Sequence, residues 1–106
     1  MSPADFRRIA LEMPGATEAT HMQHADFRVG GRIFATLGYP DERFAVVLLT
    51  PDDQAAFVAA APNVFSPVAG GWGRRGSTQV TLACADTRNA RKAITAAWQR
   101  RAPKLR

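Results

Sequence analysis

Apolar residues recur with a helical period at both ends of the chain. Within each stripe, the apolar positions recur at i, i+3, i+4 and i+7, so that they share one face of a helix. The first stripe consists of Phe6, Ile9, Ala10 and Met13, and the second consists of Ala90, Ala93, Ile94, Ala97 and Trp98. Ser2 and Asp86 precede the stripes as capping residues, and prolines follow them. The pattern predicts a helix at each end of the chain and a short alanine-rich helix over 54–61.

The segment 26–37 has the pattern of a β-hairpin. Strand-like residues flank Gly30-Gly31, a pair that can adopt the positive φ angles of a two-residue turn. With this turn, Phe27 lies opposite Phe34, and the aromatic pair would point toward the core. The preceding residues 16–24 show no clear period, and no element is predicted there.

Two further strands complete the predicted sheet. Residues 43–49 are apolar on both faces, so this strand is expected to be central and covered. Apolar positions alternate over 78–84, which places Cys84 on the inner face. Tight hairpins without regular βαβ alternation favour the α+β class. The prediction is an antiparallel sheet of about four to five strands with helices packed on it, formed by a single domain over residues 1–106.

Composition indicates a small globular protein. With 106 residues, 46% of them apolar, the chain is long enough for one modest core. Its longest apolar run, 55–61, is much shorter than a membrane span, and the first residues lack the apolar region of a secretory signal. The only cysteine, Cys84, excludes an internal disulfide. These features predict a cytoplasmic protein with no membrane partner, and they do not indicate an oligomeric state.

Positive charge is concentrated in the last third of the chain. The net charge of +5 combines five arginines against eight carboxylates in residues 1–73 with nine basic residues against Asp86 alone in residues 74–106. A basic region of this kind attracts nucleic acid, phosphorylated ligands or acidic protein surfaces. The alternative is a solvated surface that serves solubility.

The segment 70–76 is the most distinctive part of the sequence. It lies in a long connection, 62–77, and sets Trp72, Arg74 and Arg75 among four glycines. An aromatic ring beside two guanidinium groups can stack on a base and contact phosphates, which suits single strands or exposed bases. The alternative is that Trp72 covers an edge of the core while the arginines stay solvated.

Four segments together resemble the MmcQ/YjbR family. They are Met13-Pro14-Gly15-Ala16 before Glu18, the hairpin 26–35, the Gly-Trp-Gly-Arg-Arg-Gly loop 71–76, and 96–98 with 102–105. The resemblance implies a small α+β protein of the CyaY-like or double-wing fold, with DNA binding proposed and no enzymatic activity established. Many relatives resemble Asn-Lys-x-His-Trp where residues 73–77 are Gly-Arg-Arg-Gly-Ser. A role of that histidine therefore does not transfer to this chain.

Two hypotheses of function follow from these observations. The first is a non-enzymatic module that binds DNA or another nucleic acid through the Trp72 loop, the hairpin and the basic last helix. The predicted binding residues are Arg28, Arg32, Trp72, Arg74, Arg75, Arg88, Arg91 and Lys92. For the residues of the last helix, the alternative is a charged outer face that keeps the helix soluble.

The second hypothesis is a small-molecule or anion-binding protein with a pocket between the 62–77 loop and the sheet. His21, His24, Arg28 and Trp72 would surround this pocket, and an unrecognised enzyme is one form of the hypothesis. The two histidines have neither a metal-site spacing nor a nearby cysteine, so no metal and no cofactor are predicted. Because the sequence has no nucleophile motif or phosphate-binding loop, no catalytic residue is predicted; a non-enzymatic protein is favoured, and the question of enzymatic activity stays open.

Overall fold

The computed structural model describes residues 1–103, and Lys104, Leu105 and Arg106 lie outside the described residues. The elements in chain order are α1 (Pro3–Glu12), β1 (Thr17–His21), β2 (His24–Val29), β3 (Arg32–Leu37), β4 (Phe44–Leu48), α2 (Pro51–Ala60), β5 (Phe65–Pro67), α3 (Gly71–Arg74), β6 (Ser77–Thr81), a 3₁₀ turn (Leu82–Cys84) and α4 (Thr87–Arg101). The predicted α+β class is confirmed, and α1, α2 and α4 are the three predicted helices. No helix within residues 1–103 is both long and apolar enough to cross a membrane.

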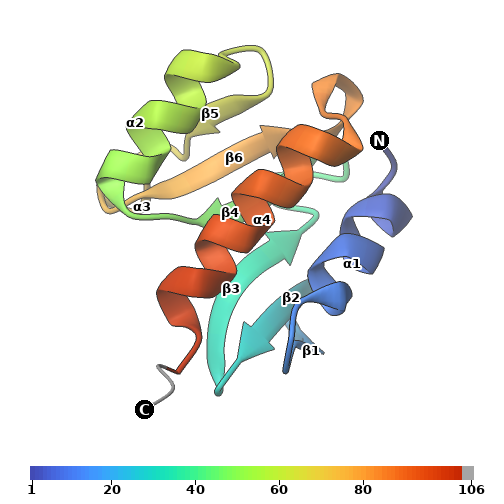
Figure 1. The fold of residues 1–106 in the computed structure, drawn as a ribbon. Helices are drawn as coiled ribbons and strands as arrows, with labels where there is room; N and C mark the ends of the chain where they lie inside the picture. Colours follow the sequence, from blue (N-terminus) through green and yellow to red (C-terminus); the bar gives the residue numbers. More distant parts are fainter. Residues whose placement is uncertain (104–106) are drawn as a thin grey trace.

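The sheet has one face covered by helices and one face left open. Its six antiparallel strands lie in the order β1-β2-β3-β4-β6-β5. Figure 1 shows α1, α2 and α4 on the same side, with α4 across the middle of the sheet. In β4, Ala45 and Val47 belong to the core, whereas Val46 and Leu48 point to the opposite face and line a hollow there. This strand is central, as predicted, but helices cover only one of its faces.

The core lies between the helices and the covered face of the sheet. Phe6 and Ile9 of α1 and Ile94 of α4 are fully buried there, in the stripes that their helical period predicts. Phe27 of β2 reaches the same cluster, with its ring centroid 6.3 Å from that of Phe6. The apolar periods of the sequence therefore identify the side chains that hold the two terminal helices to the sheet.

Polar contacts fix α4 beside α1. Trp98 packs against the core and donates from Nε1 to the carbonyl oxygen of Pro14 at 2.9 Å. About two helical turns before Trp98, Arg91 forms an ion pair with Glu12 at 2.7 Å. These contacts join the end of α1 to the second half of the chain, so the basic face of α4 is partly engaged within the protein.

Two edge strands raise the strand number above the prediction. β1 lies within the unassigned residues 16–24, and its side chains are largely exposed, because an edge strand with no buried face has no apolar alternation to detect. Its turn to β2 uses Met22 and Gln23 at φ angles of 53° and 68°, where glycine or asparagine is more usual. The other edge strand, β5, lies with α3 inside the predicted connection 62–77.

Two details of the strands differ from the prediction. Phe27 pairs with Ala35 and Arg28 with Ile33, so Phe34 is the extra residue of a β-bulge and does not lie opposite Phe27. Both phenylalanine rings are nevertheless fully buried. The expected inner position of Cys84 was wrong, because β6 ends at Thr81 and the following 3₁₀ turn leaves the cysteine exposed.

Candidate functional site

The open face of the sheet carries a hollow of about 550 Å³, which we call the trough. Four strands, β2, β3, β4 and β6, contribute to its floor. Neighbouring strands lie about 4.8 Å apart, so the floor is roughly 14 Å wide. The floor residues are Asp26, Ile33, Thr36, Val46, Leu48 and Ser77. The trough has the size of a small-molecule site, for which volumes of about 300–1,000 Å³ are usual.

Exposed apolar side chains border the trough on both sides. One wall is formed by the β1–β2 turn and the loop after β3, and it includes His21, Met22, His24 and Tyr39. The opposite wall is formed by α3, which contributes Trp72. Met22 is 78% exposed, Tyr39 50% and Trp72 65%, and only one other large apolar residue of 1–103, Leu11, is exposed. The exposed large apolar side chains therefore concentrate around this one hollow.

A buried carboxylate lies in the trough floor. Asp26 is 1% exposed and accepts hydrogen bonds from Nε and Nη2 of Arg28 at 2.8 and 3.1 Å. The side-chain hydrogen bonds to Asp26 raise the pKa of Arg28. Arg28, which the sequence assigns to a nucleic-acid or pocket contact, is thus occupied in compensating this carboxylate and does not line the trough.

An ion pair braces the loop that carries Tyr39. Arg43 donates to the Asp41 carboxylate from Nε, Nη2 and its backbone N–H, at 3.0, 2.8 and 2.9 Å. These hydrogen bonds lower the pKa of Asp41 to about 2. At the wall itself, the His24 ring meets the Tyr39 ring edge to face, with 6.3 Å between centroids. Tyr39 is therefore held in this wall by the contact with His24 of β2 and by the Asp41–Arg43 pair within its own loop.

The glycines of 70–76 allow α3 to lie directly against the sheet. A Cβ at Gly73 would overlap the carbonyl oxygen of Val68, and a Cβ at Gly76 would overlap that of Leu49. Gly76 also has a φ angle of +114°, which side-chain-bearing residues rarely adopt. The segment is therefore a packed helical turn, and this close contact sets the position of Trp72.

The indole of Trp72 faces outward from this turn. Its 65% exposure contradicts the interpretation of Trp72 as a cover for the core. The guanidinium carbon of Arg75 lies 5.5 Å from the centre of the indole ring, a cation–π contact. Arg74 is exposed on the same turn. The structure thus brings the two neighbouring arginines close to Trp72, which alone of the three lines the trough.

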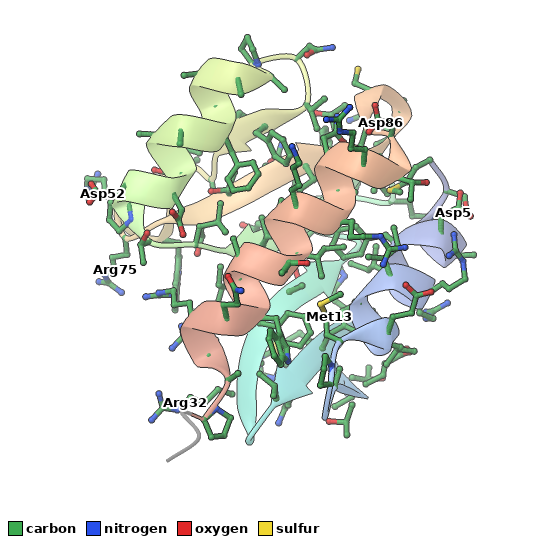
Figure 2. All side chains as sticks on the ribbon, viewed as in Figure 1. Asp5, Met13, Arg32, Asp52, Arg75 and Asp86 are labelled. Carbon is green, nitrogen blue, oxygen red and sulfur yellow. The ribbon has the colours of Figure 1, made fainter. Side chains whose placement is uncertain are left out.

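The other predicted nucleic-acid contacts lie elsewhere. Arg88, Arg91 and Lys92 lie together on the outer face of α4, the helix that covers the other side of the sheet. Arg32 begins β3, and Figure 2 shows it near the C-terminal end of α4. The predicted residues therefore do not form one continuous surface, because the outer face of α4 points away from the sheet, whereas Trp72 borders the trough on the opposite face of the sheet.

Of the four residues that the sequence analysis placed around a pocket, the structure places His21, His24 and Trp72 at the trough and Arg28 outside its lining, and the floor residues were not predicted. The available signal was the second apolar face of residues 43–49, which carries Val46 and Leu48. Within residues 1–103, no group of three His, Cys, Asp or Glu side chains is arranged to hold a metal ion. The chemistry that the trough offers is apolar contact, aromatic stacking and a few hydrogen bonds.

The fold and the trough define a small α+β protein with a one-sided layer of helices and an open, pocket-bearing sheet face. The family model named YjbR matches residues 11–100, and the chain belongs to the YjbR family. The resemblance found in the sequence is thereby confirmed. Among solved structures, Deinococcus radiodurans protein DR2400, with a domain of the DUF419 family, is similar at 16% identity and a TM-score of 0.73, over 92% of this chain and 75% of that chain. No curated protein matches the sequence.

The contact of α3 with the sheet predicts opposite effects for two neighbouring glycines. Gly73→Ala places a methyl group against the Val68 carbonyl and should lower the free energy of unfolding by about 2–3 kcal/mol. Gly71→Ala meets only side-chain atoms at 3.7 Å or more and should leave it unchanged or raise it by up to about 1 kcal/mol. Urea unfolding of both variants measures the difference, and equal effects would contradict the packing of α3.

The brace of the Tyr39 loop predicts an acid-sensitive ion pair. In an NMR titration, the Asp41 carboxyl should have a pKa of about 2, and Arg43→Ala should return it toward the ordinary 3.8. Because the folded-state pKa is depressed, the stabilisation is present at pH values above 3.8 and is lost as the pH falls toward 2. The stability difference between the wild type and Arg43→Ala should shrink over that range, and a constant difference would contradict the ion pair.

Proposed function

We propose that this protein binds a small ligand in the trough and that the ligand has a flat, largely apolar body that packs against Trp72. The observation that carries the proposal is the position of Met22, Tyr39 and Trp72, three exposed apolar side chains that border the same hollow. Clustered exposed apolar groups mark interaction sites, whereas single ones are ordinary surface features. An apolar hollow with a few convergent polar groups is the usual form of a small-molecule site.

The shape and chemistry of the trough favour a flat ligand. Ile33, Val46 and Leu48 give the floor an apolar surface, and the exposed Trp72 ring offers a stacking partner at its side. Stacked or edge-to-face rings contribute about 0.5–1.5 kcal/mol beyond the area that they bury. In the floor, Thr36 and Ser77 carry hydroxyl groups that can donate or accept hydrogen bonds and so orient the ligand.

A thermal-shift and NMR screen with planar aromatic compounds tests the proposal. Ligands of the trough should raise the melting temperature and perturb resonances of Val46 and Leu48. Trp72→Ala should weaken their binding by about tenfold, because it removes the stacking surface. Leu11→Ala, which removes an exposed apolar side chain outside the trough, is the matched control and should leave affinity unchanged. If no planar compound binds, or if both variants respond alike, the proposal fails.

A second candidate, binding of single-stranded nucleic acid, is favoured by the contact between Arg75 and Trp72. An exposed indole beside guanidinium groups can stack on a base and neutralise phosphates. Such a strand would follow α3 and the trough, and the residues on the outer face of α4 would not take part.

Fluorescence anisotropy with a single-stranded oligonucleotide over a salt series tests this second candidate. The slope of log affinity against log salt should lose about 0.7 for each phosphate contact that is removed. Arg74→Gln with Arg75→Gln should reduce the slope, whereas Arg88→Gln with Lys92→Gln should not. Absence of saturable binding at low salt, or an equal response of both pairs, would exclude a strand bound along α3.

A further inference from the structure

The antiparallel register gives the trough two chemically different ends. β3 begins at Arg32, β4 ends at Leu48, and β6 begins at Ser77, which pairs with Leu48. In an antiparallel sheet these termini meet at the same edge. Ile33, Leu48 and Ser77 therefore mark one end of the trough floor, and Tyr39 and His24 lie toward the other end.

Arginines gather at the first of these ends. Arg75 lies two residues before Ser77, and Arg100 Nη1 donates to the carbonyl oxygen of Leu48 at 3.4 Å. Figure 2 shows Arg32 and Arg75 on the same side of α4, toward its C-terminal half. We call the arginines at this edge of the sheet the arginine end; they are Arg32 at the start of β3, Arg74 and Arg75 before β6, and Arg100 and Arg101 at the end of α4. They lie beside the end of the trough and do not line it.

Positive charge at the arginine end is not balanced by ion pairs among residues 1–103. The ion pairs there involve Arg7, Arg8, Arg28, Arg43 and Arg91. Asp52, near Arg75 in Figure 2, takes part in none of them. The pKa of Arg101 is lowered first by burial and then by the repulsive charges of Arg100 and Arg32. An anion at this end would relieve that repulsion.

The opposite end of the trough has a different character. The loop beyond Tyr39 carries Asp41 and Glu42, and the only basic side chain in that loop, Arg43, is paired with Asp41. An anionic group would therefore be repelled at the Tyr39 end and attracted at the arginine end. An elongated ligand would be oriented by this difference.

We propose that the ligand of the trough is a planar anion, with a flat ring system against Trp72 and a phosphate or carboxylate group held by Arg75 and Arg100. This inference rests on the proposed function and adds the charge and orientation of the ligand. Arg75 is suited to the role because its guanidinium already lies against the indole ring, so that ring and anion are recognised side by side. Guanidinium groups bind both phosphate and carboxylate through pairs of parallel hydrogen bonds.

Calorimetric titration with four probes tests the charge requirement. The probes are adenosine 5′-monophosphate, adenosine, 2-naphthoate and inorganic phosphate. The two planar anions should bind about tenfold or more tightly than adenosine, because charge-assisted hydrogen bonds are added to stacking. Inorganic phosphate should bind more weakly than either planar anion, because it lacks the ring. Comparison of adenosine 5′-monophosphate with 2-naphthoate separates a phosphate ligand from a carboxylate ligand.

Variants at the arginine end and on the outer face of α4 test where the anion binds. Arg75→Gln and Arg100→Gln should each weaken the binding of planar anions by about tenfold, and Arg100→Gln should leave adenosine unaffected. Because the cation–π contact with Trp72 comes from Arg75, the Arg100→Gln variant separates loss of charge from loss of stacking. Arg88→Gln, on the outer face of α4, is the control and should change nothing.

The outcomes distinguish this inference from the proposed function. If adenosine binds as tightly as its monophosphate and the arginine variants have no effect, the ligand is not a planar anion, although the trough remains a binding site. If Arg88→Gln weakens binding as much as Arg100→Gln, the anion does not bind specifically at the arginine end, and the inference is overturned. If none of the planar probes binds and Trp72→Ala changes nothing, the proposed function fails with it.

Discussion

The structure depends on the division of strand side chains between a face covered by helices and a face without them. In β4, Val47 reaches the core and Val46 reaches the trough, although the two residues are adjacent and identical. Residues 1–103 form three helices of ten residues or more, and all three pack on the same side of the sheet. The apolar side chains of the second face therefore remain as a floor, and the turn at Met22, the loop at Tyr39 and α3 become its walls. The candidate site is a consequence of how few helices are available to cover the sheet.

Much of this fold can be predicted from sequence because burial imposes a period. The stripes of α1 and α4 and their capping residues all correspond to the structure, since an amphipathic helix on a sheet needs one apolar face. β1 could not be predicted, because an exposed edge strand has no such period. The pairing of Phe27 with Ala35 also escaped prediction, since a bulge moves the register without changing which residues are apolar. For the site, the sequence analysis named His21, His24 and Trp72, which lie at the trough, but not its floor. A strand that is apolar on both faces, such as residues 43–49, is compatible both with a second layer of helices and with an open apolar pocket.

The basic residues that are grouped in the sequence are not grouped in the folded structure. The sequence assigns the basic character to residues 74–106 as a block, but folding divides that block between two sides of the sheet. Arg88, Arg91 and Lys92 remain on the outer face of α4, whereas Arg74 and Arg75 join Arg100 and the distant Arg32 at one end of the trough. A charge count therefore does not show which arginines lie together. The antiparallel register does, because it brings the start of β3, the end of β4 and the start of β6 to one edge.

The floor and the α3 wall contribute differently to recognition. Floor residues such as Val46 and Leu48 belong to strands whose alternation also supports the core, so their positions follow from the fold that this chain shares with a structure of only 16% identity. α3 is held by close backbone approach at Gly73 and Gly76, and the side chains of Trp72, Arg74 and Arg75 are exposed outside the core. A change in those side chains can alter the ring or the charge on this surface at little cost in stability. The fold therefore supplies the hollow, and under the proposed function the side chains of the short helix select the ligand.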